Sequence, residues 1–212
     1  MTGAGRPTPS TGARTIGPEP AGATPIDEED LAGLIPDFVA TRADLNQVEF
    51  ENISRALPWA HRRARASGVE GVLSYAFLIE LHRRMFGDVW RWAGRLRRRV
   101  TNIGVVPAQI ATQTASALAD ARFWHQEAVF DTDELAARIQ GRLVAVHPFP
   151  NGNGRSTRLM ADLYLVAIDA PVFSWGRSRL DEEDAGRAAY ISALVAAVET
   201  DDYAELVRFA RG

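Results

Sequence analysis

Apolar residues recur every three to four positions from about residue 41 to the C-terminus. This spacing places them on one face of a helix, so the pattern predicts a series of amphipathic helices. Thr41 followed three residues later by Asp44 has the pattern of a capping box at a helix start. Pro58 is expected to end or kink that first helix, and Gly87 to stop the next one. The other predicted starts are Ser74, Pro107, Asp131, the turn at 152–154, Asp181 and Asp202.

Each predicted helix has an apolar face that is expected to point into one core. These inward positions include Leu45, Val48, Ile53 and Leu57 on the first helix and Leu159, Leu163 and Val166 on the helix that follows residue 152.

Residues 95–106 break the helical pattern. They combine a run of arginines with β-branched residues, Asn and Gly, which is typical of a short hairpin or an extended flap. The expected fold class is therefore all-α, a helical bundle with a short β-hairpin flap.

The first 25 residues differ in composition from the rest of the chain. They contain five prolines and five glycines among Thr, Ser and Ala. Such a segment buries too little apolar surface to offset the entropy of ordering, so we expect a disordered tail over 1–25. The remaining 26–212 are expected to form a single domain, with N-terminal helices over 26–66 and the core over 74–212. No internal repeat is visible.

Composition excludes several classes of protein. Apolar residues make up 46% and charged residues 24% of the 212 positions. No apolar run approaches the ~20 residues of a membrane span, and no secretory signal is expected at the N-terminus. The chain has no cysteine and a net charge of −3. These features favour a cytoplasmic protein with no membrane partner and argue against nucleic acid as a partner, despite arginines on several helix faces.

The most informative segment is 147–158, which reads His-Pro-Phe-Pro-Asn-Gly-Asn-Gly-Arg-Ser-Thr-Arg. His147 supplies an imidazole that can accept a proton near neutral pH. The glycine-rich turn at 152–154 opens a helix, and backbone N–H groups at a helix start favour anions. Arg155 and Arg158 add two guanidinium groups on that helix. Together they indicate chemistry on a phosphorylated ligand.

Each of these features also has a structural alternative. Glycines before a helix are often only a turn, two arginines can be solvated or paired with acids such as Asp162, and His147 can serve as a core or capping residue. His61, His82 and His125 lack the spacing of metal ligands, so structural roles are expected for them.

This segment resembles the signature of the Fic family, which has the Fic/Doc fold. The family pattern is His-Pro-Phe-x-(Asp or Glu)-Gly-Asn-Gly-Arg-x-x-Arg, and eleven of the twelve positions are compatible with it. The resemblance extends over roughly 41–210, including 90–104 and 190–206, and is greatest to the mobile mystery protein B subgroup. It implies a protein nucleotidyltransferase that moves AMP from ATP to a Ser, Thr or Tyr hydroxyl of a target protein.

The resemblance also implies a role for each matching residue. His147 would be the general base, while Gly152, Asn153 and Gly154 would hold the transferred phosphate. Arg155 would bind the next phosphate and Arg158 the terminal one. A flap made of Thr101, Asn102, Ile103 and Gly104 would hold the target segment as an added strand.

One position departs from the family pattern. Asn151 stands where an acid usually binds Mg²⁺ or Mn²⁺, and an amide oxygen carries no charge, so metal affinity should fall. Three outcomes stay open: weaker metal binding, use of another phosphorylated donor or a reversed nucleotide, or loss of transfer activity.

Some Fic proteins carry an inhibitory helix with the pattern (Ser or Thr)-x-x-x-Glu-(Gly or Asn). Glu51 and Asn52 match its last two positions, whereas Gln47 stands at the first. The hypothesis is an inhibitory pair between Glu51 and Arg158, and its alternative is that Glu51 is an exposed helix acid.

Two other functions remain as alternatives. One is a non-catalytic nucleotide- or protein-binding module, half of a mobile-element toxin–antitoxin-like pair. The other is phosphotransfer with the nucleotide reversed. An antitoxin-like partner and a homodimer are both compatible with the sequence.

Overall fold

A computed structural model describes residues 16–17, 26–176 and 183–212. Apart from Ile16 and Gly17, the predicted tail lies outside the described residues. The helices are α1 (Glu28–Leu31), α2 (Arg42–Val72), α3 (Tyr75–Phe86), α4 (Ile110–Gln126, after the 3₁₀ turn η1, Pro107–Gln109), α5 (Thr132–Val146), α6 (Asn153–Ala167), α7 (Glu183–Thr200) and α8 (Ala204–Arg211).

Local capping explains where several helices begin. The Thr41 hydroxyl accepts from the N–H of Asp44, whose carboxylate accepts from the N–H of Thr41, which confirms the predicted capping box. Ser74 caps α3 in the same way through the N–H of Phe77, and Asp131 caps α5.

The prediction for Pro58 is wrong, because α2 continues through it. The backbone leaves helical geometry only at Gly68, which has φ 61° and ψ −169°. A glycine adopts this conformation without steric cost, so the break falls there and not at the proline.

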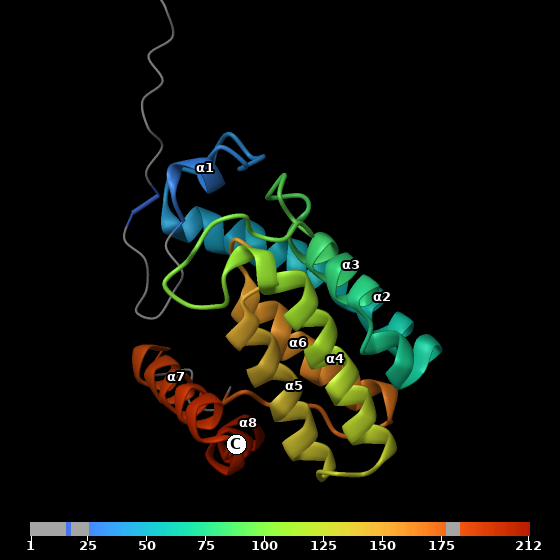
Figure 1. The fold of residues 1–212 in the computed structure, drawn as a ribbon. Coiled ribbons are helices and arrows are strands. Elements are labelled where there is room, and N and C mark those ends of the chain that lie inside the picture. The colour runs from blue at the N-terminus through green and yellow to red at the C-terminus, as the bar shows by residue number, and fades with distance from the viewer. Residues whose placement is uncertain (1–15, 18–25, 177–182) are drawn as a thin grey trace, which may run out of the picture.

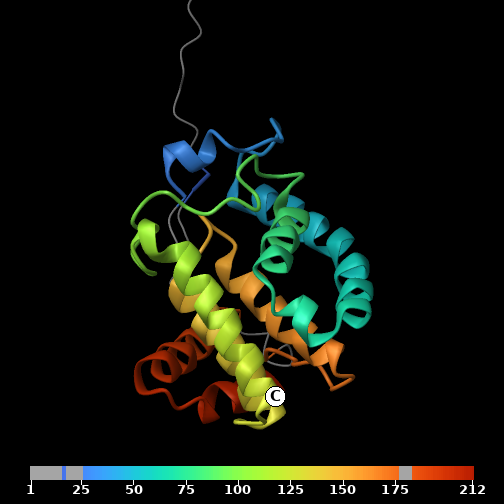
Figure 2. The same cartoon turned by 45° about the vertical axis from the view of Figure 1, so that its right-hand side comes forward.

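Helix α6 is the centre of the molecule. It packs against α2 on one side and α5 on the other, and α4 lies outside α5 (Figures 1 and 2). Nearly every side chain of α6 after Arg155 is buried, including Met160, Leu163 and Leu165. The helix is therefore an interior element, and it carries the sequence motif at its N-terminus.

The face of α2 that meets this core differs from the prediction. Val48, Ile53 and Leu57 are only half-buried, whereas Leu45 is buried as expected. The fully buried line continues from Leu45 through Glu49, Asn52, Ala56, Ala60 and Ala64. Small alanines let the backbones approach closely, and the larger side chains then lie at the edges of the contact.

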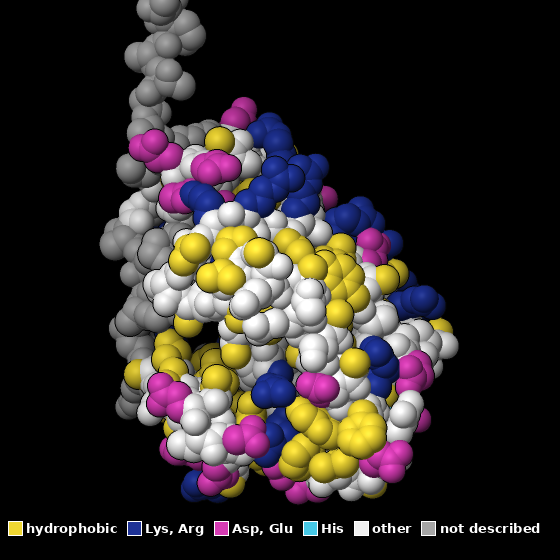
Figure 3. All heavy atoms as spheres, in the orientation of Figure 1, with side chains coloured by type: hydrophobic (Ala, Val, Ile, Leu, Met, Phe, Trp, Pro, Cys, Tyr) yellow, Lys and Arg dark blue, Asp and Glu magenta, His cyan; other side chains and the backbone are white. Residues whose placement is uncertain are grey.

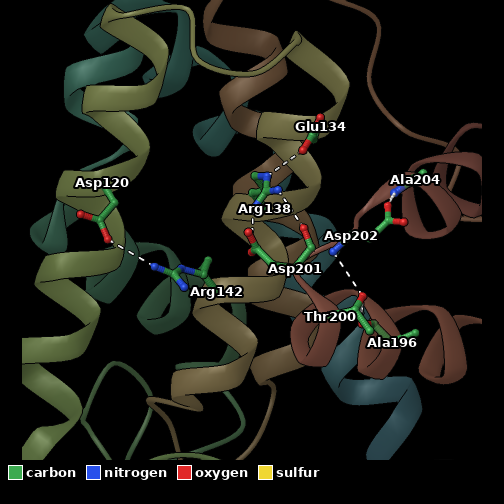
Figure 4. A network of polar contacts seen from close by, with 9 residues as sticks. All are labelled: Asp120, Glu134, Arg138, Arg142, Ala196, Thr200, Asp201, Asp202 and Ala204. Carbon is green, nitrogen blue, oxygen red and sulfur yellow. Dashed lines mark hydrogen bonds and ion pairs between the residues drawn. The ribbon is translucent and has the colours of Figure 1, made fainter.

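Helices α7 and α8 form a second, smaller cluster against α5, made of Ala137, Ala193, Ala197, Tyr203 and Leu206. Figure 4 shows the polar anchor of this cluster: the buried guanidinium of Arg138 on α5 pairs with Glu134 at 2.9 Å and with Asp201, between α7 and α8, at 2.8 Å. This arginine therefore holds the C-terminal helices in place by ordinary ion pairs.

The segment 95–106 is an extended flap and not the hairpin named in the predicted fold class. No strand pairing is present in it, and the β-bridge outside named strands joins Leu34 to Trp90. No helix among the described residues is both long and apolar enough to cross a membrane.

Candidate functional site

His147 lies at the C-terminal end of α5 in an unusual backbone conformation. Its φ of 55° and ψ of 61° place it in the left-handed region, where non-glycine residues are uncommon. Pro148 disfavours helical geometry for the residue before it, which explains why α5 stops here. The side chain is 4% exposed. His147 is therefore fixed at the junction of α5 and the motif turn.

The environment keeps the His147 imidazole neutral. Burial lowers its pKa to about 4; a hydrogen bond with the backbone of Val144 opposes this, and the nearby charge of Arg97 adds to it. A neutral imidazole at pH 7 can accept a proton, as a general base must.

The motif turn is held by the Asn153 side chain. Its amide oxygen accepts from the N–H of Phe149 at 2.9 Å, and its NH₂ donates to the Phe149 carbonyl at 2.8 Å. Asn153 is buried, so this amide shapes the turn from within. Gly152 adopts φ 78°, and a Cβ there would lie 2.6 Å from the Phe86 ring. Only glycine fits that position.

The N-terminus of α6 is open to an anion. Among the described residues no side chain caps it, so its first N–H groups have no partner of that kind. A Cβ on Gly154 would meet nothing closer than Arg158 at 4.0 Å. The free space beside these N–H groups suits the close approach of a phosphate.

The two arginines of the motif turn toward different neighbours. Arg155 pairs with Glu49 of α2, with 2.6 Å between Nη1 and Oε2, and its guanidinium lies over the Phe86 ring. Arg158 lies over the ring of Tyr190 on α7, 4.8 Å from its centroid. The structural alternative is that acids pair with both arginines. Among the described residues an acid pairs with Arg155 only.

Glu49 is a buried acid beside the motif that the sequence analysis missed. Its carboxylate is 3% exposed and also accepts from the indole N–H of Trp90 at 2.7 Å. Glu49 lies one helical turn after Leu45 on the buried face of α2. In the sequence that face is predicted from large apolar residues, and this criterion passes over an acid.

The predicted inhibitory pair of Glu51 and Arg158 is not formed. Glu51 is exposed and accepts from the Gln47 amide at 2.7 Å, one turn away on α2. Asn52 instead faces the core, where its amide donates to the Arg84 carbonyl and to Asp88. Glu51 cannot reach the motif from the same helix as Glu49, because position 51 lies about 200° around the helix axis from position 49.

The residues around Asn151 do not make a divalent-cation site by themselves. Its Oδ1 accepts from the N–H of Gly152 at 2.6 Å, and no cluster of three or more His, Asp or Glu side chains suited to a metal occurs in the described part of the chain. Mg²⁺ in nucleotide sites is bound through at least one carboxylate plus phosphates, and this charge is missing at Asn151.

The Asn151→Asp variant is expected to gain metal dependence. A carboxylate at this place adds a charged ligand beside the bound phosphates, so ATP affinity should rise on the order of tenfold when Mg²⁺ is added, with little change in the wild-type protein. Calorimetric titration of ATP with and without Mg²⁺ measures this. Equal Mg²⁺ effects in both proteins would show that position 151 is not near the metal.

His82 fixes the turn from below. Its ring is fully buried, stacks on Phe149 and accepts from the N–H of Gly94 through Nδ1 at 3.0 Å. Nε2 therefore carries the proton and donates to the Asn151 carbonyl at 3.0 Å. Burial lowers its pKa to about 3. This agrees with the structural role expected from the sequence.

The predicted target-docking residues lie together at the tip of the flap. Asn102, Ile103 and Gly104 are exposed, and the Thr101 hydroxyl donates to the Ile103 carbonyl at 2.5 Å. Within the described residues, none of these four backbone N–H groups is paired. An edge of this kind can receive an extended peptide.

The arginine run at 97–99 is not a single basic surface. Arg97 is buried, Arg98 is exposed, and Arg99 pairs with Asp30 at 2.8 Å and with Asp27. The basic side chains that Figure 3 shows over the C-terminal end of α3 belong to a separate surface pocket, which contains none of the residues 147–158; its arginines are Arg55, Arg83, Arg84, Arg91 and Arg95.

Comparison with known proteins gives the same picture of the motif region. Residues 72–165 match the family model described as Fic/DOC family. The chain is 33% identical over 98 residues to protein adenylyltransferase fic-1 of Caenorhabditis elegans, which covers 44% of this chain and 19% of that protein. It is 30% identical over 106 residues to protein adenylyltransferase VbhT of Bartonella schoenbuchensis, covering 43% and 21%. The match thus spans about a fifth of each of these relatives.

The fold has counterparts among solved structures. BepC of Bartonella tribocorum with bound AMPPNP superposes with a TM-score of 0.60 at 15% identity, covering 82% of this chain and 87% of that one. At this identity the likeness shows the fold, and it confirms the all-α prediction.

Proposed function

Because residues 72–165 form a Fic/DOC-family domain, we propose that this protein is an adenylyltransferase that moves AMP from ATP to a hydroxyl of a protein. One observation carries the proposal: a buried, neutral imidazole directly precedes a helix N-terminus that offers open N–H groups and two guanidinium groups. Two relatives of this chain are named protein adenylyltransferases.

In the proposed reaction His147 accepts the proton of the attacking hydroxyl. The oxygen of that hydroxyl forms a bond to the α-phosphorus as the bond to the β-phosphate oxygen breaks, and pyrophosphate leaves. Gly152, Asn153 and Gly154 hold the transferred phosphate at the start of α6, and Arg155 and Arg158 neutralise the phosphates that leave. The unpaired edge at 101–104 holds the target segment.

Glu49 acts as a brake in this proposal, in the place first assigned to Glu51. Its carboxylate forms an ion pair with the guanidinium of Arg155, which a phosphate of the nucleotide has to bind. The nucleotide and Glu49 therefore compete for Arg155. The Trp90 indole holds the carboxylate in position.

The Glu49→Gln variant is therefore expected to bind ATP on the order of tenfold more tightly, because an amide still accepts from Trp90 but competes poorly for a guanidinium. Isothermal titration with ATP measures this. Glu51→Gln is the matched control on the same helix, and it should bind as the wild type does. Weaker binding in Glu49→Gln would mean that Glu49 orients Arg155 for the nucleotide.

The proposed activity is tested by incubating the protein with ATP labelled in the α- or the γ-phosphate, with peptides containing Ser, Thr or Tyr as acceptors. Nucleotidyl transfer leaves the α-label, and no γ-label, on protein or peptide. The γ-label alone would show phosphotransfer with the nucleotide reversed, and this would refute the proposal.

The second candidate is a non-catalytic binding module of a toxin–antitoxin-like pair, favoured by Asn151. It predicts ATP binding with neither label transferred. Against it stand the intact His147, Arg155 and Arg158, which binding alone does not require in this combination.

A further inference from the structure

Arg97 is buried without a carboxylate partner. Its side chain is 4% exposed and donates to four backbone carbonyls: His147 at 2.6 Å, Arg99 at 2.6 Å, Val146 at 3.3 Å and Val105. Among the described residues no acid pairs with it. Burying a guanidinium costs free energy unless its N–H donors are hydrogen-bonded. The backbone carbonyls around Arg97 supply these bonds in place of a carboxylate.

The four carbonyls belong to two different parts of the molecule. Val146 and His147 end α5, where backbone carbonyls have no partner inside the helix and carry partial negative charge. Arg99 and Val105 lie on the two limbs of the flap. One guanidinium therefore ties both limbs of the flap to the residue proposed as the general base.

Backbone hydrogen bonds join the same two segments, the flap and the end of α5. The N–H of Arg97 donates to the Pro148 carbonyl at 2.9 Å, and the N–H of Val105 donates to the Val146 carbonyl at 3.3 Å. At Gly104 the packing is so close that a Cβ would lie 2.5 Å from the Cβ of His147 and 2.6 Å from the guanidinium of Arg97. The flap thus packs against His147, and the Arg97 guanidinium lies between the flap and the end of α5.

We propose that Arg97 is a positioning residue that sets the flap and His147 in a fixed relation, so that a target segment docked on the flap presents its hydroxyl to the imidazole. Arginine suits this task because its planar fork offers five donors in a rigid geometry, whereas lysine offers three from a single point. The role in catalysis rests on the adenylyltransferase function proposed above.

Hydrogen–deuterium exchange of the flap tests the coupling without requiring turnover. In Arg97→Met the amides of position 97 and Val105, which donate to the carbonyls of Pro148 and Val146, should exchange about tenfold faster or more. One hydrogen bond from a charged donor corresponds to at least that factor. Arg97→Lys should give an intermediate rate, because it keeps the charge and part of the bonding. The His147 ring titration, followed by NMR, should move to higher pH in Arg97→Met.

Arg138→Met is the matched control. Arg138 is also buried, but it pairs with Glu134 and Asp201 and anchors α7 and α8 (Figure 4). It should lower the melting temperature without changing flap exchange or the His147 titration. If Arg97→Met does not fold, Arg97→Lys keeps the test valid, because lysine keeps the charge but offers three donors from a single point in place of the planar fork.

The outcomes separate this proposal from the proposed function. Wild-type flap exchange in folded Arg97→Met, or in Arg97→Lys if Arg97→Met fails to fold, would overturn the positioning role whatever the protein transfers. Fast flap exchange with a wild-type transfer rate would overturn its catalytic part. Fast exchange, a lower kcat and unchanged ATP affinity would support it. An absence of transfer in the wild type would refute the adenylyltransferase proposal, and with it the catalytic role, while leaving the exchange result as the test of the coupling.

Discussion

Replacing His147 with alanine lowers transfer of AMP by a factor on the order of 10²–10⁴, the contribution expected of a general base. ATP binding should stay within about twofold of the wild type, because the phosphate contacts come from 152–158 and not from the imidazole. Labelling rates and ATP titrations measured on the same preparations separate the two effects. A variant that loses binding and transfer together would place His147 in nucleotide binding.

The pH profile gives an independent check on the same residue. Burial lowers the pKa of His147 to about 4, so the base stays neutral down to about pH 5 and is lost as the pH falls through 4. An ordinary histidine would be half protonated near pH 6.5. Stability follows the same sign: because the folded pKa is below the unfolded one, stability is full above about 6.5 and falls as acid is added toward 4. A rate that halves near pH 6.5 would contradict this environment.

The glycines of the motif turn should respond to alanine in opposite ways. Gly152→Ala places a side chain at φ 78° and within 2.6 Å of Phe86. Left-handed geometry costs about 1–2 kcal/mol, and overpacking about 1–3 kcal/mol, so the free energy of unfolding should fall by roughly 2–5 kcal/mol. Thermal or urea unfolding measures the change.

Gly154→Ala should leave stability unchanged or raise it by up to about 1 kcal/mol, because the position is helical and its Cβ meets open space. The same Cβ occupies the approach to the helix N-terminus, so ATP affinity should fall by about tenfold or more. Wild-type affinity in Gly154→Ala would mean that no phosphate sits there.

Local chemistry explains which parts of the fold were predictable from the sequence. Thr41 with Asp44, and Asp131 with Glu134, mark helix starts because both partners lie within one turn of the chain. The motif could be recognised for the same reason, since His147, Gly152 and the two arginines lie in one continuous segment.

Long-range contacts account for what could not be predicted. Glu49 and Arg155 are 106 positions apart, and only the packing of α2 on α6 brings them together. Arg97 belongs to a charged run, which by composition indicates a solvated surface, yet the end of α5 buries it. Pro58 shows the reverse case, where tertiary packing of α2 overrides a local signal.

The most direct test of the proposed activity compares α-labelled ATP transfer in the wild type, Glu49→Gln and the double variant Glu49→Gln, His147→Ala. The account predicts label on protein that increases in Glu49→Gln and disappears in the double variant. Label that persists without His147 would contradict the assignment of the base, and ATP bound by all three proteins with no label transferred would identify a binding module instead of an enzyme.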